Sequence, residues 1–252
     1  MRTWFRNSAR RCGRRCGRWL KRVSLLNRGL EEFAHVASHD LQEPLRMVRS
    51  YSQLLVRRLG SEATAEQREY ASFIQTGAKR MEGLIRDLLA YSRTAYATGD
   101  QPSEVSLEEA LGQALARVEG RISETEAEIK WDALPVVRGE AGQFSHVFQN
   151  LLSNALKYQR AGHRPRVHVG ANKDGGEWVI SVRDNGIGFE QHQAERIFGL
   201  FKRLHREDEY PGSGLGLAIC QRIIERYGGR MWARSAAGAG ATFFFSLPVV
   251  RG

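Results

Sequence analysis

The chain has 252 residues, 42% of them apolar and 26% charged, a balance that is typical of one or two folded domains. Six prolines and three cysteines exclude a collagen, a low-complexity chain and a disulfide scaffold, and no apolar run approaches the roughly eighteen residues of a membrane span. The formal charge of +10 comes from residues 1–28, which hold nine Arg, one Lys and no acidic residue. Because the remaining 28 basic side chains balance the 28 acidic ones, we expect no specific nucleic-acid surface on the folded part.

The basic segment 1–28 is interpreted as a poorly ordered leader. Its charge is also compatible with a transit peptide, a segment that meets anionic lipid or a nucleic-acid arm. Cys12 and Cys16 would supply two metal ligands, whereas a structural zinc site needs about four. The cysteine usage fits a reducing compartment, and we expect the protein in the cytoplasm.

Two helical arms are expected between residues 29 and 93. Apolar residues recur with a three-four spacing from Leu30 to Leu59 and again from Tyr70 to Tyr91, and Gly60 and Ser61 interrupt the pattern. The arms would form a helical hairpin with one wide apolar stripe. Since a single hairpin buries such a stripe poorly, the sequence predicts a homodimer in which two hairpins form a four-helix bundle.

Residues 94–103 are predicted to be a linker, and residues 104–252 to form a second domain of mixed α/β type. Helices are expected at about 106–119, 140–158 and 215–227, and strands at about 166–171, 177–183, 230–235 and 241–247. This order favours a two-layer α/β sandwich whose helices cover one face of the sheet.

His39 lies on the first arm, in the segment SHDLQEPLR at 38–46. In the heptad of that arm it takes the outermost position f, beside Asp40 and ahead of Pro44, a residue that loosens the turn before it. Taken alone, such a residue is most simply a surface histidine without a role. His35 and His39, one helical turn apart, would share a metal ion only with a third ligand, and the spacing offers none.

Four short clusters follow in the second domain, which has no P-loop motif. They are NLLSNALKY at 150–158, DNGIGF at 184–189, FGLFKR at 198–203 and GSGLGL at 212–217. Singly, each has a plain structural interpretation, such as a solvated helix face, a tight turn or a helix cap. Their fixed order is what points to a nucleotide site.

In this combination the sequence resembles the sensor histidine kinases of two-component systems, whose ATP-binding domain has the Bergerat (GHKL) fold. The clusters match that family's N, G1, F and G2 boxes, residues 38–46 match its H box, and the match covers residues 30–249. The H box and residues 201–214 are most similar to phytochrome-associated and PAS-linked kinases. The resemblance implies a protein-histidine kinase that uses ATP and Mg²⁺.

The resemblance also assigns residues to the nucleotide. Asn154 is the Mg²⁺ ligand, and Asn150 supports the site. Lys157 offers a point charge to the phosphate oxygens, and the ring of Tyr158 lies near the adenine. Asp184 accepts a hydrogen bond from the adenine amino group.

The remaining assignments concern the loops around the nucleotide. Gly186 and Gly188 let the backbone approach the base. A lid at about 190–214 contains Phe201 and Arg203, and Arg203 reaches the γ-phosphate during transfer. The lid ends at the glycines of the fourth cluster, which are Gly212, Gly214 and Gly216.

By the same resemblance, the neutral imidazole of His39 attacks the γ-phosphorus through Nε2, while Asp40 orients the ring and accepts its proton. The phosphoryl group then passes to an aspartate of a separate response regulator, and the input comes from an upstream sensor module or protein. Many of these kinases carry Thr or Asn where this chain has Glu43, four residues after His39. We therefore expect weak or absent phosphatase activity toward the regulator.

Other functions remain as alternatives. A catalytically silent dimeric ATP-binding scaffold would share the fold but relay only conformation. ATPases of the chaperone or mismatch-repair type, and anti-sigma serine kinases, lack a histidine-bearing hairpin before the ATP-binding domain. Nucleic-acid binding would rest on residues 1–28 alone.

Overall fold

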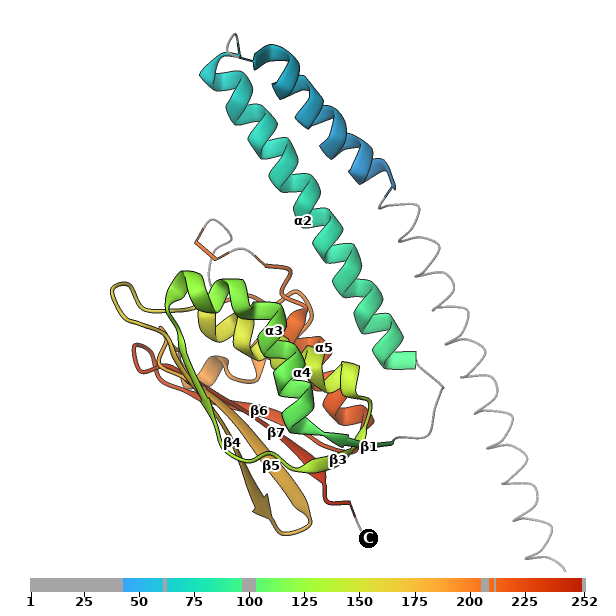
Figure 1. Ribbon diagram of the computed structural model, residues 1–252, viewed down its shortest axis with the longest axis vertical. Helices are drawn as coiled ribbons and strands as arrows, with labels where there is room; N and C mark the ends of the chain where they lie inside the picture. The colour runs from blue at the N-terminus through green and yellow to red at the C-terminus, as the bar shows by residue number, and fades with distance from the viewer. Residues whose placement is uncertain (1–42, 61–62, 97–102, 205–208, 211, 251–252) are drawn as a thin grey trace, which may run out of the picture. The chain divides into compact units, whose positions relative to one another are not determined.

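The computed structural model describes residues 43–60, 63–96, 103–204, 209–210 and 212–250, and these residues belong to two compact units, Met1–Ala97 and Thr98–Gly252 (Figure 1). Each unit is described by itself. Within the described residues, no helix combines the length and the apolar character that are needed to cross a membrane.

The described part of the first unit is a helical hairpin. Its first helix includes residues 43–59, and its second is α2 (Ala65–Tyr96). A capping box starts α2: the backbone N–H of Gln67 donates to Oγ1 of Thr64 over 3.2 Å, and the N–H of Thr64 donates to the Gln67 side chain over 2.9 Å. Gly60 has φ +51°, which ends the first helix close to the predicted interruption.

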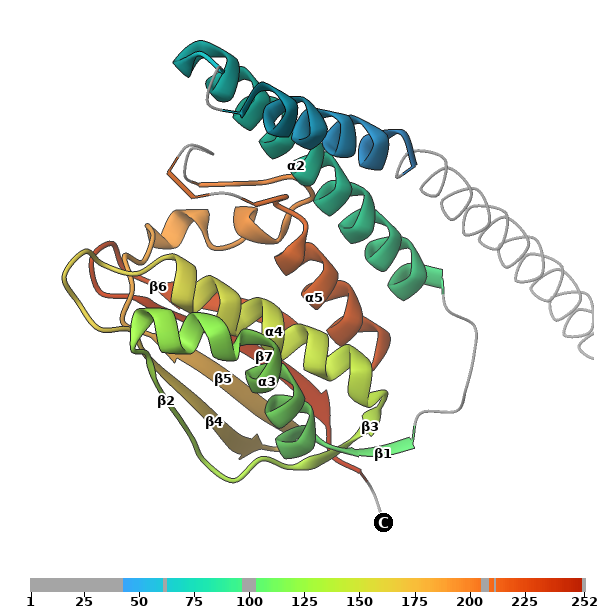
Figure 2. The ribbon, with the colours of Figure 1, turned by 45° about the horizontal axis from the view of Figure 1, so that its top comes forward.

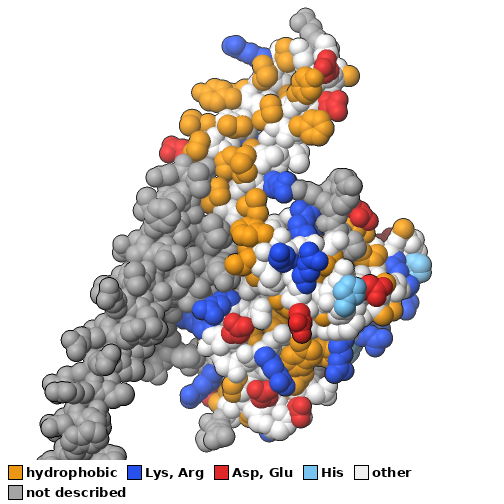
Figure 3. Space-filling view, turned by 180° about the vertical axis from the view of Figure 1, so that it is seen from behind, with side chains coloured by type: hydrophobic (Ala, Val, Ile, Leu, Met, Phe, Trp, Pro, Cys, Tyr) orange, Lys and Arg blue, Asp and Glu red, His pale blue; other side chains and the backbone are white. Residues whose placement is uncertain are grey.

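Small and polar side chains join the two helices of the hairpin. Ser52, Ala71 and Ala78 are buried, the hydroxyl of Ser52 donates to the carbonyl of Ala71 over 3.4 Å, and Arg49 forms a 2.8 Å ion pair with Glu82. The large apolar residues lie on the outer faces. Exposed members of the predicted stripe are Val48, Tyr51, Leu55, Tyr70, Ile74 and Met81. Figure 3 shows hydrophobic side chains gathered on this hairpin.

The second unit contains a five-stranded sheet of order β2-β4-β5-β7-β6. Its strands are β2 (Glu128–Trp131), β4 (Arg166–Asp174), β5 (Glu177–Asp184), β6 (Met231–Ser235) and β7 (Ala241–Pro248). β2 runs parallel to β4, and all other neighbours are antiparallel. Gly175, with φ +58°, allows the tight β4–β5 hairpin that the sequence predicts. A separate antiparallel pair joins β1 (Ser103–Ser106) to β3 (Val136–Gly139).

Three helices cover one face of this sheet: α3 (Leu107–Thr125), α4 (Ala141–Lys157) and α5 (Gly216–Arg226) (Figure 2). Alternate strand residues point to opposite faces, so Val182, Phe243 and Ala233 form a buried row across β5, β7 and β6 toward the helices. The ring of Phe148 on α4 meets that of Phe245 edge-on at 5.8 Å. The predicted two-layer α/β sandwich is confirmed.

The structure differs from the sequence expectation at several boundaries. α2 continues to Tyr96 and β1 begins at Ser103, so both ends of the predicted linker 94–103 lie in regular structure. α3 extends to Thr125, six residues beyond the predicted end, because Glu126 adopts a left-handed conformation that caps it. The strands β1, β2 and β3 were not predicted.

Candidate functional site

The exposed side of α4 carries the first cluster of polar residues. Its other side is buried, with Phe144, Phe148 and Leu151 in the core. Asn150, Asn154 and Lys157 repeat at spacings of four and three residues, and each is half-buried. Leu152 and Ala155 lie between them in sequence and are buried. The helical repeat therefore places the two amides and the ammonium together on the opposite, less buried side of α4.

The first and fourth clusters touch. A Cβ built on Gly216, the first residue of α5, would lie 2.2 Å from Oδ1 of Asn150, so only a glycine allows this approach. The Asn150 amide nitrogen also lies 2.9 Å from Nε2 of His146. The backbone N–H of Leu215 donates to the Ser213 hydroxyl, which shapes the turn into α5.

The end of α4 meets the third and fourth clusters. The ammonium of Lys157 donates to the Tyr158 hydroxyl over 2.9 Å, and a Cβ on Gly212 would lie 3.0 Å from that ammonium. The Tyr158 ring packs on that of Tyr210 at 4.9 Å, and the Arg203 guanidinium donates to the carbonyl of Tyr210 over 2.8 Å.

Burial and neighbouring charges change the ionisation of this group. Burial, together with the nearby charges of Arg203 and Arg121, lowers the pKa of Lys157 to about 8. Burial also raises the pKa of the Tyr158 hydroxyl. The ammonium of Lys157 and the guanidinium of Arg203 place positive charge at the end of α4, which suits an anionic ligand.

The second cluster packs against the end of α4. The backbone N–H of Ile187 donates to the carbonyl of Tyr158 over 2.9 Å, and a Cβ on Gly186 would lie 2.3 Å from that carbonyl. Gly188 has φ +61°, and a Cβ there would lie 2.1 Å from the carbonyl of Ala236. Both glycines are therefore required by the close approach of backbone segments.

Asp184 is mostly buried at the end of β5. Its Oδ1 accepts hydrogen bonds from the backbone N–H groups of Gly186 at 2.8 Å and Ala241 at 3.2 Å. Burial raises the pKa of the carboxyl, although these two hydrogen bonds oppose the change. Oδ2 has no hydrogen-bond partner among the described residues, so one carboxylate oxygen is held by the fold and the other is left to accept from a ligand.

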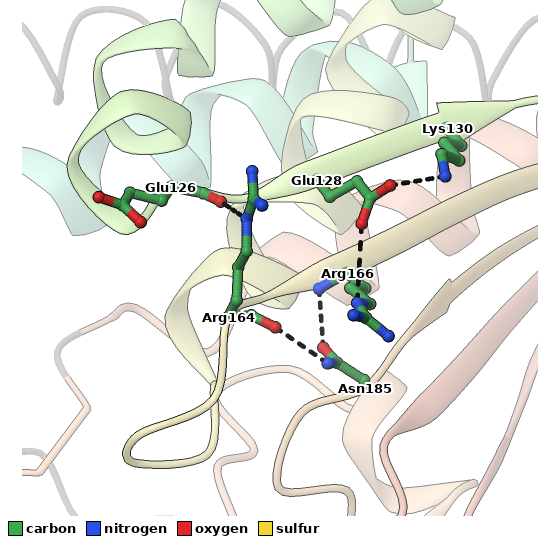
Figure 4. A network of polar contacts seen from close by, with 6 residues as sticks. All are labelled: Glu126, Glu128, Lys130, Arg164, Arg166 and Asn185. Atoms are coloured by element: carbon green, nitrogen blue, oxygen red, sulfur yellow. Dashed lines mark hydrogen bonds and ion pairs between the residues drawn. The ribbon is translucent and has the colours of Figure 1, made fainter.

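Asn185 fixes the loop that carries these groups (Figure 4). Its Oδ1 accepts from the backbone N–H of Arg166 over 2.8 Å, and its Nδ2 donates to the carbonyl of Arg164 over 3.0 Å. Glu128 on β2 pairs with Lys130 at 2.6 Å and with Arg166 at 3.6 Å, which ties the same region to the edge of the sheet. The sequence analysis gave Asn185 no role, although an Asn after a strand is typical of such loop contacts.

The segment between the second and fourth clusters contains the 3-10 turns η2 (Gln191–Gln193) and η3 (Arg196–Phe198). The Gln191 side chain donates to the carbonyl of Ala233 over 3.2 Å and accepts from the N–H of Ser235 over 2.9 Å, so it is bound to the free edge of β6. Sequence reasoning missed Gln191, and no local pattern marks it.

Phe201 and Gly214 meet in the same segment. Phe201 has φ +58° and a side chain that is 58% exposed. Gly214 has φ +72°, and a Cβ there would lie 3.0 Å from the Phe201 carbonyl carbon and 3.2 Å from the Arg203 side chain. The backbone between the third and fourth clusters is therefore in close contact.

The structure thus brings the four sequence clusters together around the end of α4. His39 and Asp40 lie outside the described residues, as do His35, Cys12 and Cys16. No group of three or more His, Cys, Asp or Glu side chains suited to a metal ion occurs within the described part of the chain. The side-chain oxygen of Asn154 is a neutral, hard ligand atom of the type that Mg²⁺ binds.

Two protein families match the chain. The "His Kinase A (phospho-acceptor) domain" matches residues 30–96, and the "Histidine kinase-, DNA gyrase B-, and HSP90-like ATPase" family matches residues 139–251. Among solved structures, full-length ShkA in complex with AMPPNP is similar, with a TM-score of 0.66 and 30% identity over 88% of this chain and 46% of that one.

Curated relatives include two phytochromes. "Cyanobacterial phytochrome A" of Nostoc sp. is 47% identical over 224 residues, which are 88% of this chain and 29% of the relative. "Phytochrome-like protein Cph1" of Synechocystis sp. is 42% identical over 226 residues, which are 88% of this chain and 30% of the relative. The chain spans less than a third of the length of these relatives.

Proposed function

The chain belongs to the sensor histidine kinases, and on that premise we propose that it is an ATP-dependent protein kinase that phosphorylates its own His39 and passes the phosphoryl group to an aspartate of a separate response regulator. In this proposal residues 29–93 form the dimerisation and phosphotransfer domain, and residues 104–252 bind ATP. The input comes from an upstream sensor module or protein.

The single observation that carries the proposal is the convergence of the four clusters. Asn150 contacts Gly216, Lys157 contacts Gly212, and Tyr158 contacts the loop of Gly186. The polar groups that meet there carry opposite charges. A carboxylate with one available oxygen lies on the β5 side, and a lysine and an arginine lie by the end of α4. A nucleotide needs this polarity, because its base offers an amino donor while its phosphates are anionic.

Asp184 is assigned to the adenine. Its available Oδ2 would accept a hydrogen bond from the exocyclic amino group, and guanine presents a carbonyl oxygen at that position. The base pocket is completed by the Tyr158 ring and by the loop of Gly186 and Gly188, which can pack closely on the Tyr158 and Ala236 carbonyls because these glycines have no Cβ.

The phosphates are assigned to the α4 side. Lys157 and Arg203 offer their cations to the phosphate oxygens, and Phe201, Gly212 and Gly214 belong to the lid over them. Asn154, whose half-buried amide faces away from the core, fits a hard divalent cation, with Asn150 beside it. When bound, Mg²⁺ would neutralise phosphate charge.

The transfer step is assigned to the first unit. Nε2 of His39 forms a bond to the γ-phosphorus as the bond to the bridging oxygen of ADP breaks, and Asp40 takes the proton from Nδ1. The P–N bond formed is reactive enough to pass the phosphoryl group to a carboxylate of the regulator.

The homodimer follows from the exposed apolar stripe of the hairpin. Tyr51 is 70% and Leu55 57% exposed, although both recur on one helix face. A second copy of the hairpin would cover these side chains, because four helices enclose an apolar seam that two leave open.

The test is incubation of the chain with γ-labelled ATP and Mg²⁺, followed by treatment with acid and with base. We expect label that survives base and is lost in acid, as a phosphohistidine requires. His39→Gln should bind ATP with near wild-type affinity and take up no label, because the acceptor and the base pocket lie in different units.

Other outcomes separate the alternatives. Label on serine, or label retained in His39→Gln, would refute the assignment of the acceptor. ATP binding without any label would favour the catalytically silent scaffold.

A further inference from the structure

A hollow of about 490 Å³ lies at one end of the five-stranded sheet, beneath the turn that joins β6 to β7. Its wall contains Arg183 from β5, Arg234 from β6, Thr242 from β7 and the alanines of the turn. Asp184 also lines the hollow and belongs to the second cluster, whereas the other wall residues lie outside the four clusters. The size is within the range of pockets that hold small organic ligands.

Two arginines face this hollow from opposite sides of one residue. In the strand register, Thr242 is paired with Arg183 on one side and with Arg234 on the other. Neighbouring strands lie about 5 Å apart, so the two Cα atoms are about 10 Å apart and both long side chains can reach one ligand. Both arginines are exposed.

Neither arginine is neutralised by the protein. Among the described residues, Arg183 and Arg234 form no ion pair, and the only recorded contact of the Arg234 guanidinium is with the Phe244 ring, 5.7 Å away. Asp184 is the one carboxylate in the wall; two backbone N–H groups hold its Oδ1, and its Oδ2 is the oxygen that is assigned to the adenine. The two exposed guanidinium groups therefore give this face of the sheet a local positive charge that attracts anions.

The other residues of the wall limit the chemical type of ligand that the hollow can hold. Thr242 adds a hydroxyl between the guanidinium groups, while Ala236, Ala239 and Ala241 add small apolar surface. Ser235 and Gln191 are already engaged, because the Ser235 hydroxyl donates to the carbonyl of Gly240 and the Gln191 amide is bound to β6. A short organic body would therefore lie against the alanines, with its oxyanion between the arginines.

We propose that this hollow is a binding site for a small organic oxyanion, whose phosphate or carboxylate group is held by Arg183, Thr242 and Arg234. Arginine suits this role because its planar guanidinium donates two parallel hydrogen bonds to such a group. Of the wall residues, only Asp184 also belongs to the proposed nucleotide site, so variants of the two arginines test this proposal without altering that site.

The test is an NMR titration of the full chain with glycerol 3-phosphate and, separately, with glutarate, at constant ionic strength. In wild type we expect saturable shifts of the Gly240 and Thr242 amide signals with at least one of the two. Arg183→Gln and Arg234→Gln should each weaken that binding about tenfold, because each removes a charge-assisted contact. Arg183→Lys keeps the charge and should bind with intermediate affinity.

Arg138→Gln on β3 is the matched control, since Arg138 is an exposed strand arginine outside the hollow. Equal affinity in all variants, or no saturable shift in wild type, would overturn the proposal. A phosphate carried by lipid is the other source of this chemistry. The chain could instead sediment with phosphatidic acid vesicles in a way that depends on Arg183 and Arg234, while neither free compound shifts the amide signals. That outcome would also overturn the small-molecule site.

Discussion

The side-chain oxygen of Asn150 lies only 2.2 Å from the position that a Cβ atom on Gly216 would occupy. The contact joins the middle of α4 to the first residue of α5, two helices that are 66 residues apart in sequence at these points. This contact forms because Gly216 has no Cβ atom, so an alanine at this position tests it.

Gly216→Ala should weaken ATP binding about tenfold with little effect on folding. The added methyl group displaces the end of the Asn150 side chain, which can move without disturbing the core, but which the proposal places beside the metal ligand Asn154. Titration with a fluorescent ATP analogue and thermal unfolding measure the two effects. Gly112→Ala in α3 is the control, because a Cβ there meets no atom within 4 Å. Wild-type affinity in Gly216→Ala would contradict the role of this contact.

Asp184→Asn should reduce ATP affinity about 10- to 100-fold and leave stability unchanged within about 1 kcal/mol. The Asn oxygen can still accept from Gly186 and Ala241, whereas its NH₂ group would face the adenine amino group with a second donor. Burial raises the pKa of the Asp184 carboxyl, so the neutral amide also avoids the cost of a buried charge. Calorimetric titration with ATP gives the affinity, and Asp174→Asn, on the exposed end of β4, is the control.

The affinity for ATP should fall as the pH rises through about 8, the value to which burial and the neighbouring arginine charges lower the Lys157 pKa, since the phosphates are attracted to the ammonium form. Stability should change in the other direction. Between about 8 and the ordinary value of 10.5, the unfolded chain binds a proton that the folded chain has lost, so the free energy of unfolding rises with pH across that window.

Lys157→Arg tests this assignment, because a guanidinium stays charged throughout the range. The variant should bind ATP with little dependence on pH between 7 and 9, as measured by titration at each pH. Lys173→Arg, an exposed lysine near the end of β4, is the control and should retain the wild-type profile. An unchanged profile in Lys157→Arg would assign the titration to another group.

Leu55→Glu combined with Ile74→Glu should dissociate the dimer while ATP affinity stays as in wild type. Both side chains are exposed on the hairpin, at 57% and 47%, so a charge there costs little in one chain but would be buried between two. Sedimentation velocity reports the mass. Gln53→Glu with Ser72→Glu adds the same charges at exposed polar positions of the same helices. A dimer that persists in the apolar-to-Glu variant would refute the bundle.

Glu43→Thr should gain phosphatase activity toward the regulator, and the wild type should have little. Glu43 is exposed at the start of the described part of the first helix and follows His39 by four residues in sequence, so its carboxylate would repel the anionic phospho-aspartate. The rate at which pre-phosphorylated regulator decays, with and without the protein, measures the effect. If wild type accelerates the decay and Glu43→Ala abolishes the acceleration, Glu43 acts as a base toward water instead.

The sequence predicted the larger elements because their pattern repeats several times. α4, α5 and the strands β4 to β7 lie within three residues of their expected bounds. β2 was missed because Glu128–Trp131 is short and half of its residues are charged, and its stability comes from parallel pairing with β4, far along the chain. β1 and β3 have four residues each and pair only with each other.

The candidate site shows the same difference between residues in local sequence patterns and residues that act through distant contacts. Asn150, Lys157 and Asp184 were predicted because they stand in short local patterns. Gln191 and Asn185 act through contacts with Ala233, Ser235 and Arg166, and the spacing along the sequence does not reveal such partners. Tyr210, which packs on Tyr158, was likewise visible only once the chain was folded.

The contact of Gln191 with β6 also bears on how the protein behaves at high concentration. β6 is the last strand of the sheet, and an uncovered last strand offers its backbone to any other extended chain, which is how ordered aggregates start. The Gln191 amide occupies an acceptor at Ala233 and a donor at Ser235 on that strand, in the manner of one more residue of sheet. One side chain thereby blocks the pairing of a second copy along that part of β6.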